Sequence, residues 1–230
     1  GVGGAKAQLS SPHIDALRDR AVAAFKATGL PTARTEAWKF TSAAPLIKSN
    51  AAPVVTSADP ETLPANALAV DCPTVVLVDG AISDKLSTLD NLPQGLTVRS
   101  ASAGDAGLGD LLPLDGFPFA ALNTASFRDA VMIEVAAGQT VETPVHIVSV
   151  STDAKVPQIS HPRICIKVGK GAIAAVAESH VGEGGVSFAN VAVEVDVADD
   201  AVLTHVKLQD ESRDGFHTAI FLTGIQDFNY

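Results

Sequence analysis

Residues 191–209, VAVEVDVADDAVLTHVKLQ, decide the fold that this sequence predicts. In the first half, valines alternate with Glu194 and Asp196, and an extended strand places alternate side chains on opposite faces. Asp200 then marks a tight turn, after which a second strand-like segment begins. The stretch therefore predicts two strands joined by a turn, with one face of the sheet buried.

Two earlier stretches follow the same plan, VMIEVAAGQTVETPVHIVSV at residues 131–150 and RICIKVGKGAIAAVAESHV at residues 163–181. Their turns fall at Gly138 and Gly171, so that with Asp200 successive turns are 33 and 29 residues apart, which is the scale of a repeat architecture. Glycine adopts the positive φ that a tight turn needs, and aspartate tolerates it. Units this short bury their apolar faces by stacking on neighbours. The sequence predicts a mainly β chain with a β-solenoid or β-helix, and an ordinary β-sandwich is the alternative.

The first 50 residues predict helices. Ser11 can cap a helix that begins at Pro12, apolar residues then recur with a 3.6-residue period, and Gly29 ends it. Residues 50–70 carry three prolines without a period, which indicates a linker or surface loop. We therefore expect an N-terminal helical domain and linker over residues 1–70 and a β-core over residues 71–230.

Three shorter elements are predicted before the repeats. The segment TVVLVDGAI is an apolar run that ends in Asp-Gly, which indicates a strand and a turn, and LTVRSA is a second strand. The segment FPFAALNTASF predicts a short helix. These elements lie at residues 74–82, 96–101 and 117–127.

The composition limits the partners of the chain. Its 230 residues are 47% apolar, and 16 basic residues stand against 26 acidic ones, for a net charge of −10. Such acidity repels nucleic acid backbones and anionic lipid heads, so we expect neither nucleic acid nor membrane as a partner, although solubility is a simpler reason for it. No apolar run reaches the roughly 18 residues of a membrane span. The first 11 residues lack the apolar centre of a secretory signal. These features of the composition and of the N-terminal segment predict a soluble protein in a reducing compartment.

The two cysteines give little sign of chemistry. Cys72 and Cys165 lie far apart and form no CxxC pair, so they cannot make a tetrahedral metal site by themselves. Cys165 lies in the apolar run RICIKV and is expected to be a small buried core residue.

The histidines are the obvious candidates for chemistry. His13 is expected to be exposed in the first turn of the first helix, and His146 to lie on a solvated face or at an interface. His161 begins the segment HPR, in which its expected duty is structural, while Arg163 offers a fork for a carboxylate. The six histidines are His13, His146, His161, His180, His205 and His217.

One pair of segments could gather polar side chains. Glu178 and His180 share a face of one predicted strand, and His205, Lys207 and Gln209 have the same spacing in the next. Stacked in register, they could form a metal or general-base site. A polar ladder on an exposed face is the favoured interpretation. Because no HExxH, GxSxG or paired CxxC motif appears, we predict no catalytic residue and no metal ligand.

Several segments resemble a known family. The segment RTEAWKFT at residues 34–41 is similar to the N-terminal signature of the SufB/SufD family, an Arg-x-Glu-x-Trp-(Arg/Lys)-(Tyr/Phe)-(Thr/Ser) motif that follows the first helix. FAALNTASFRDAVMIEVAAGQTVETPVHIVSV resembles the entry of that family into its core. HPRICIKVGKGAIAAVAESHVG and AVLTHVKLQDES resemble its next segments. These three lie at residues 119–150, 161–182 and 201–212.

Within this family the chain resembles SufD more than SufB, because its N-terminus is compact and helical and it lacks a cysteine-rich region. The resemblance implies a right-handed parallel β-helix with helical regions at both ends. It also implies a non-enzymatic subunit of a cytoplasmic scaffold complex that, with SufB and the ATPase SufC, assembles iron–sulfur clusters. We expect the isolated chain to bind no such cluster.

Members of the family continue well past LTGIQDFNY, the last segment of this chain. We therefore expect a β-core that is incomplete at its C-terminal end, with an open edge and concentration-dependent association. The family's cluster-related histidine and its SufC-docking region lie in the later part, so no family catalytic position is carried over. Trp38 is expected to pack the N-terminal segment onto the core, with Arg34 and Glu36 in polar contacts.

Two other functions are alternatives to the assembly-scaffold subunit. A β-helix enzyme that acts on polysaccharide would be expected to line a groove with aromatic residues, and this chain has one Trp and one Tyr. A purely structural solenoid without partners would leave the tryptophan segment unexplained. The assembly-scaffold subunit is therefore the favoured hypothesis.

Overall fold

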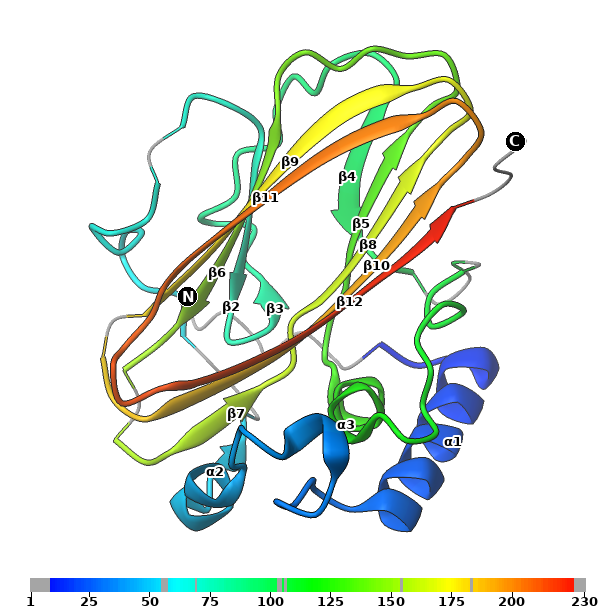
Figure 1. Ribbon diagram of the computed structural model, residues 1–230. Helices are drawn as coiled ribbons and strands as arrows, with labels where there is room; N and C mark the ends of the chain where they lie inside the picture. The colour runs from blue at the N-terminus through cyan, green and yellow to red at the C-terminus, as the bar shows by residue number, and fades with distance from the viewer. Residues whose placement is uncertain are drawn as a thin grey trace.

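A computed structural model describes residues 9–54, 58–68, 70–102, 105, 107–153, 155–182 and 184–225 (Figure 1). Short helices lie at one end of the molecule, beside two long twisted sheets. The helical segments are α1 (Pro12–Thr28), the 3₁₀ turn η1 (Glu36–Trp38), α2 (Ala44–Ser49) and α3 (Pro118–Ser126). The strands are β1 (Ala52–Pro53), β2 (Thr74–Val78), β3 (Ala81–Ile82), β4 (Leu96–Ser100), β5 (Val131–Val135), β6 (Val145–Ser151), β7 (Gln158–Ser160), β8 (Arg163–Val168), β9 (Ile173–Gly182), β10 (Ser187–Val197), β11 (Val202–Asp210) and β12 (Phe216–Ile225).

The strands form two facing sheets. The first, sheet A, has the order β1-β7-β10-β8-β5-β4, and β12 pairs with the other edge of β10. The second, sheet B, has the order β11-β9-β6-β2-β3. Pairing is parallel except for β2 with β3 and β4 with β5. The strands and turns predicted at residues 74–82 and 96–101 are confirmed.

The three repeats form successive rungs of a β-solenoid. In each rung the first strand belongs to sheet A and the second to sheet B, namely β5–β6, β8–β9 and β10–β11. The connecting turns contain Gly138, Gly171 and Asp200 with φ of 69°, 64° and 57°. They stack through backbone hydrogen bonds, for example from the Gly171 N–H to the Asp199 carbonyl at 2.8 Å. The prediction of a mainly β fold with N-terminal helices and a β-solenoid is confirmed.

The core lies between the two sheets. Inward-facing valines and isoleucines stack rung on rung, as when Val131, Ile164 and Val193 occupy one register. On sheet B the same core includes Val145 and Val176, which are also in register. The alternating valines of the opening stretch therefore face the interior, as the sequence predicted.

The opposite face of sheet A is also buried, which the alternation did not reveal. Glu194 points away from the core but lies beneath the loop before α3, where the backbone N–H groups of Gly109 and Leu111 each donate to its carboxylate at 3.0 Å. Arg163, fully buried, donates to the same carboxylate at 2.6 Å, so the expected pairing with a carboxylate is confirmed. The expected fork is not formed, because the other terminal nitrogen of Arg163 donates to Asn123 and Thr124. A buried charge needs such pairing because desolvation is costly.

The helices follow their sequence signals. The Ile14 N–H donates to the Ser11 hydroxyl at 3.2 Å, and Gly29 ends α1 with φ of 65°. The buried face of α1 contacts α3, the second predicted helix. In the predicted linker, Ala52 and Pro53 form β1 at the edge of sheet A, a position that tolerates a residue without N–H. The division into two domains at residue 70 stays a prediction.

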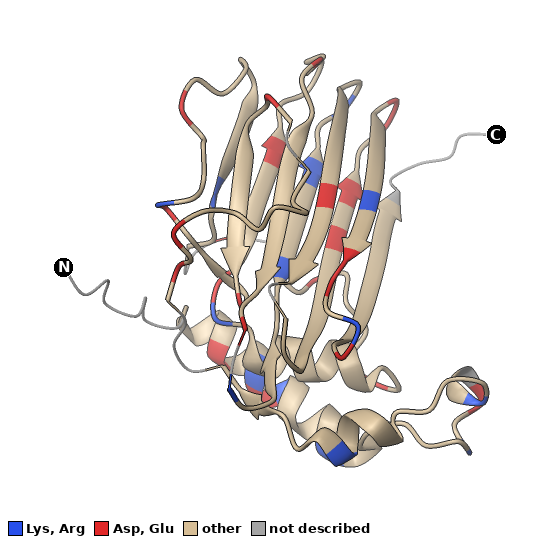
Figure 2. Ribbon diagram, turned by 90° about the vertical axis from the view of Figure 1, so that its left-hand side faces the viewer, with Lys and Arg blue, Asp and Glu red and all other residues tan. Residues whose placement is uncertain are grey.

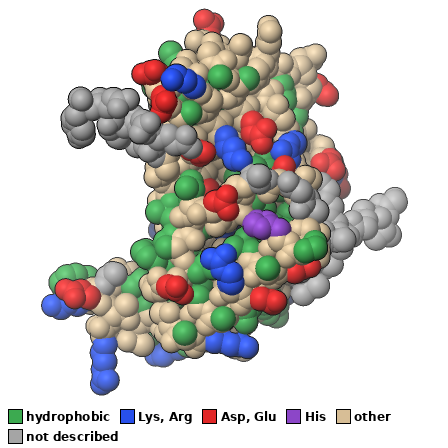
Figure 3. Space-filling view, turned by 90° about the vertical axis from the view of Figure 1, so that its right-hand side faces the viewer, with side chains coloured by type: hydrophobic (Ala, Val, Ile, Leu, Met, Phe, Trp, Pro, Cys, Tyr) green, Lys and Arg blue, Asp and Glu red, His purple; other side chains and the backbone are tan. Residues whose placement is uncertain are grey.

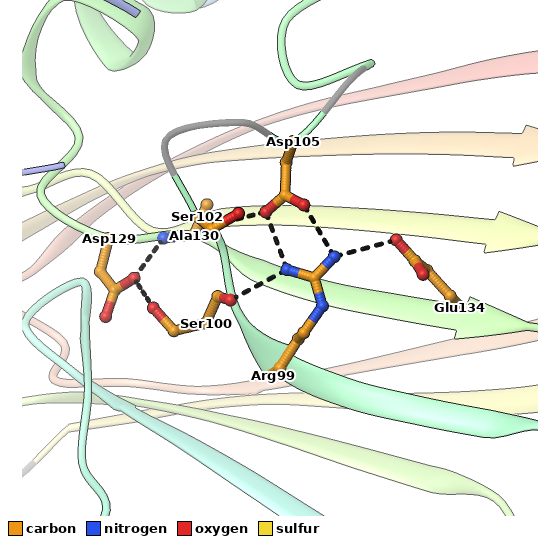
Figure 4. A network of polar contacts seen from close by, with 7 residues as sticks. All are labelled: Arg99, Ser100, Ser102, Asp105, Asp129, Ala130 and Glu134. Carbon is orange, nitrogen blue, oxygen red and sulfur yellow. Dashed lines mark hydrogen bonds and ion pairs between the residues drawn. The ribbon is translucent and has the colours of Figure 1, made fainter. Parts of the chain in front are cut away.

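A polar network fastens β4, the strand at the far edge of sheet A (Figure 4). Arg99 donates through both terminal nitrogens to the two carboxylate oxygens of Asp105, each at 2.8 Å, and also contacts Glu134 of β5 at 3.2 Å. The Ser100 hydroxyl and the Ala130 N–H donate to Asp129. The network ties the edge strand to its neighbour and to the segment that follows it.

Trp38 packs the N-terminal segment onto the core. Its ring lies 4.9 Å from the ring of Phe119 on α3, which in turn lies 5.9 Å from Phe188 on β10. The expected packing role is confirmed. The expected polar contacts are not: Arg34 and Glu36 are exposed, and neither side chain makes a hydrogen bond or ion pair with the described residues. Both side chains face solvent, so they have no polar partner in the part of the chain that the structure describes.

Candidate functional site

The interior of the solenoid, which is apolar elsewhere in the core, contains polar and charged side chains near the turn from β11 into β12, at the lower left of Figure 1. On sheet B the inward positions pair as Val176 with His205, Glu178 with Lys207 and His180 with Gln209. The alternation that directs Ala174 and Val176 into the core continues to these residues. The register expected from the sequence is therefore confirmed. We call Glu178, His180, His205, Lys207, Glu211 and His217 the luminal polar cluster.

Glu178 is the centre of this cluster. Its carboxylate is 1% exposed and accepts hydrogen bonds from His180 Nε2 and, at 3.0 Å, from His205 Nε2. The Lys207 ammonium lies 3.9 Å away. Burial alone would raise the pKa of Glu178, but the two histidine hydrogen bonds and the lysine charge outweigh it and lower the pKa. Glu178 is therefore an ionised acceptor that orients its neighbours.

Two neighbours of Glu178, His180 and Lys207, have pKa values below their usual ranges. Burial lowers the pKa of His180, and the hydrogen bond from its ring to Glu178 only partly opposes this. Burial likewise lowers the pKa of Lys207, against the attraction of Glu178 and Glu211. A neutral His180 can donate from Nε2 to the ionised carboxylate, and its other ring nitrogen, Nδ1, makes no hydrogen bond with the described residues.

His217 and Glu211 complete the cluster from the far side. His217 lies on β12, in register with the inward-facing Ala189, so it reaches the lumen from sheet A. Its Nε2 lies 2.9 Å from the Lys207 ammonium and its Nδ1 lies 2.8 Å from a Glu211 oxygen. The ring of His180 packs edge-on against that of His217, with centroids 4.8 Å apart. His180, Glu211 and His217 offer three ligand atoms within 4.8 Å of one another.

The sequence-based interpretation of an exposed polar ladder is wrong for Glu178 and His180, which are buried. They face the lumen, where the strand of the opposite sheet closes over them. The sequence also gave no reason to join Glu211 and His217 to them. Glu211 follows β11 in the turn into β12, and only the return of the chain across the lumen places it there.

The remaining histidines lie elsewhere. His13 is exposed, as expected. His146 was expected on a solvated face or at an interface but is buried, because the loops before β2 and after β3 cover the outer face of sheet B. Its Nε2 lies 2.8 Å from the Ser179 hydroxyl. His161 is buried against Asn190, and burial lowers its pKa to about 4, consistent with a structural role.

The cysteines do not approach the cluster. Cys165 is a buried core residue, as predicted, and burial together with the nearby Glu194 carboxylate raises its pKa to about 12. Burial also raises the pKa of Cys72, in part offset by a hydrogen bond with Thr74. Thiols with raised pKa values are poor nucleophiles at neutral pH.

Two views show how the charged residues are distributed. Along the ribbon of Figure 2, acidic and basic residues are interspersed over the strands, turns and helices. Figure 3 looks toward the side on which β12 borders sheet A, and histidine, lysine and carboxylate side chains lie near its centre among hydrophobic ones. Among the residues described, no helix is long and apolar enough to cross a membrane.

Comparison with known proteins agrees with this architecture. Residues 5–147 match the family profile described as the SufBD protein N-terminal region, and residues 148–221 match that of the SufBD core domain of SUF system FeS cluster assembly. A Synechocystis protein, "Iron-sulfur cluster assembly SufBD family protein slr0076", is 27% identical over 63% of this chain and 36% of its own length. "Protein ABCI7, chloroplastic" of Arabidopsis thaliana is 27% identical over 90% of this chain and 46% of its own length.

The chain thus spans less than half the length of these two curated relatives. The two family profiles nevertheless follow one another without a gap, in the order in which the N-terminal helices and the solenoid rungs occur. The chain belongs to the SufBD family of the SUF iron–sulfur cluster assembly system.

Proposed function

We propose that this chain acts as a SufD-like, non-catalytic subunit of an iron–sulfur cluster assembly scaffold, together with a SufB-like subunit and a SufC-like ATPase. The observation that carries the proposal is the match of nearly the whole chain to the two SufBD profiles. The SufD-like assignment rests on the compact helical N-terminus and on the presence of only two cysteines.

The chemistry of the described residues supports a role without catalysis. The Cys165 thiol is buried and its pKa is about 12, so it is unsuited to receiving sulfur or attacking a substrate. The Glu178 carboxylate accepts hydrogen bonds from His180 and His205. It also forms an ion pair with Lys207. Among the described residues, Glu178 and His205 are therefore engaged with each other, which supports the proposal that this pair does not act as a general base on a substrate.

The same residues support the expectation that the chain alone binds no iron–sulfur cluster. Protein clusters are held mainly by cysteine thiolates, and the two thiols here have raised pKa values and belong to different parts of the fold. The cluster would then be a product assembled by the complex. The proposed compartment is the cytoplasm, although one relative is named as chloroplastic.

Co-expression tests the proposal. The chain, tagged at its N-terminus, would be produced with the SufB-like and SufC-like proteins of the same organism and purified without oxygen. We expect both to copurify in fixed ratio and a cluster to form in the complex but not in the isolated chain. Failure of both partners to copurify, or a stable cluster on the chain alone that is lost in Cys165→Ser, would contradict the proposal.

A further inference from the structure

The luminal polar cluster holds an unusual concentration of unsatisfied atoms. Among the described residues, six buried side-chain nitrogen or oxygen atoms make no hydrogen bond, and three of them are His180 Nδ1, His217 Nδ1 and one Glu211 oxygen, Oε2. His217 Nδ1 and Glu211 Oε2 lie 2.8 Å apart, yet they are not aligned for a hydrogen bond. Buried polar atoms normally find partners, so three together point to a missing ligand.

The chemical state of His180 follows from its contacts. Its Nε2 faces the Glu178 carboxylate, which can only accept, so Nε2 carries the hydrogen. The lone pair is then on Nδ1, the buried atom without a partner. A carboxylate behind a histidine in this way is the usual arrangement around metal-binding imidazoles, because it fixes the tautomer and the ring orientation.

We propose that His180 Nδ1, His217 Nδ1 and Glu211 Oε2 bind a single divalent first-row transition metal ion. Two imidazoles and one carboxylate are a ligand set that Zn²⁺ and Fe²⁺ both accept, with at least one position left for water. One ligand atom from each of the three residues lies within 4.8 Å of those of the other two, and His217 Nδ1 lies 2.8 Å from Glu211 Oε2. Binding would draw them to separations of about 3.3 Å, as bonds of about 2.0–2.1 Å in a tetrahedral site require.

Lys207 sets a condition on this site. Its ammonium donates to His217 Nε2 at 2.9 Å, which keeps that nitrogen free of hydrogen. A metal on Nδ1 requires a hydrogen on Nε2, so Lys207 must leave His217 when the ion binds. The Glu178 carboxylate, 3.9 Å away, is the acceptor to which it can turn. Lys207 thus competes with the metal, and removing its charge should tighten binding.

The site has a route from solvent. A cavity of about 290 Å³ is lined by Glu211, Ser212, Gly215, Phe216 and His217, among others, so two of the proposed ligands border it. His180 does not line the cavity but packs directly behind it, edge-on against the ring of His217. An ion can therefore enter beside the turn between β11 and β12 without opening the solenoid.

The proposed site does not depend on the partner subunits or on the scaffold role, because its ligands all belong to this chain. It departs from the expectation from sequence that the chain has no metal ligand. It is also distinct from an iron–sulfur cluster, because no thiolate takes part.

Titration of the full chain, without a histidine tag, with Zn²⁺ by calorimetry and with Co²⁺ by visible absorption tests the proposal. We expect one ion per chain and intense Co²⁺ absorption bands typical of four-coordination. Glu211→Gln and His217→Ala should each weaken binding at least about tenfold, and Glu178→Gln about 10- to 100-fold. Lys207→Gln should strengthen it. His13→Ala, which removes an exposed histidine of α1, is the matched control and should change nothing.

Circular dichroism establishes that each variant is folded. His180→Ala is the riskiest because the ring is fully buried, so the decision rests on the half-buried Glu211 and His217. Absence of stoichiometric binding in the parent chain would overturn the proposal. So would binding that survives both Glu211→Gln and His217→Ala in folded protein, since the ion would then lie elsewhere.

Discussion

Asp105 and Glu194 are both carboxylates that pair with an arginine, but their surroundings give the two pairs different weight. Glu194 and Arg163 are buried, and each ion needs its partner because neither can be hydrated. Asp105 and Arg99 lie near the surface, where water screens the attraction. The surface pair nevertheless has ideal two-pronged geometry, which is the case in which an exposed pair contributes measurably.

Asp105→Asn should therefore destabilise the protein at neutral pH and flatten its response to acid. The hydrogen bonds from Arg99 lower the pKa of Asp105 from 3.8 to about 2. A depressed carboxyl pKa gives stability that is fully present above the unfolded value and lost as pH falls through the folded value. The parent should thus lose stability between about pH 4 and pH 2, and the variant should lose less of it. Urea unfolding at a series of pH values measures this, with the exposed Asp115→Asn as control.

A parallel loss of stability with acid in the parent and in Asp105→Asn would show that the pair seen in Figure 4 contributes nothing. Equal free energies of unfolding of the parent and the variant at neutral pH would assign the acid response of the parent to other carboxylates. The pKa argument is supported only if the variant is less stable than the parent at neutral pH and this difference shrinks as the pH falls from about 4 to about 2.

At the scale of elements, local signals predicted most of what forms. The turn glycines at 138 and 171 and the cap at Ser11 act within a few residues, so the sequence alone located the rungs and α1. The features that the sequence did not predict depend on contacts between segments that are far apart in the chain. The burial of Glu194 requires the loop at residues 107–117, and the approach of Glu211 to His180 requires the turn into β12. The alternation of apolar and polar residues predicts which side chains share a face of the sheet, but it does not predict which other segments cover that face.

Trp38→Ala should loosen the segment from η1 to α2 while the solenoid remains folded. The tryptophan is half-buried against Phe119 and borders an apolar cavity of about 450 Å³ with Phe117, Phe188 and others. Truncating a fully buried aromatic residue costs about 3–5 kcal/mol, so a half-buried one should cost about 2 kcal/mol. Limited proteolysis, with fragments identified by mass, should show faster cleavage near residues 30–50.

Phe40→Ala is the matched control, because Phe40 lies two residues away in the same signature but is 94% exposed. It should leave the cleavage rate unchanged. Equal effects of the two substitutions, or none from Trp38→Ala, would mean that Trp38 serves a partner protein and does not dock the N-terminal segment.

On the scale of the whole molecule, the last rung has neighbours on one side only. Among the described strands, β11 pairs with β9 alone and β12 with β10 alone. Their free edges carry exposed apolar side chains, including Val206 at 60% and Phe221 at 47%. A rung of a solenoid normally buries such residues under the next rung, and unpaired strand edges are templates for pairing with another chain.

We therefore expect the isolated 230-residue chain to associate as its concentration rises, through the edges of β11 and β12. Charged side chains on an edge strand oppose such pairing because association would bury them. The double substitution Val206→Lys and Phe221→Lys should shift association to concentrations about tenfold higher, equivalent to about 1.4 kcal/mol. Light scattering coupled to size exclusion measures the mass across a concentration series. Ile47→Lys, which charges an equally exposed apolar residue on α2, should not shift it. A parent chain that stays monomeric at every concentration would show that the last rung is closed by its own side chains, whereas an equal shift in all variants would assign association to general surface charge.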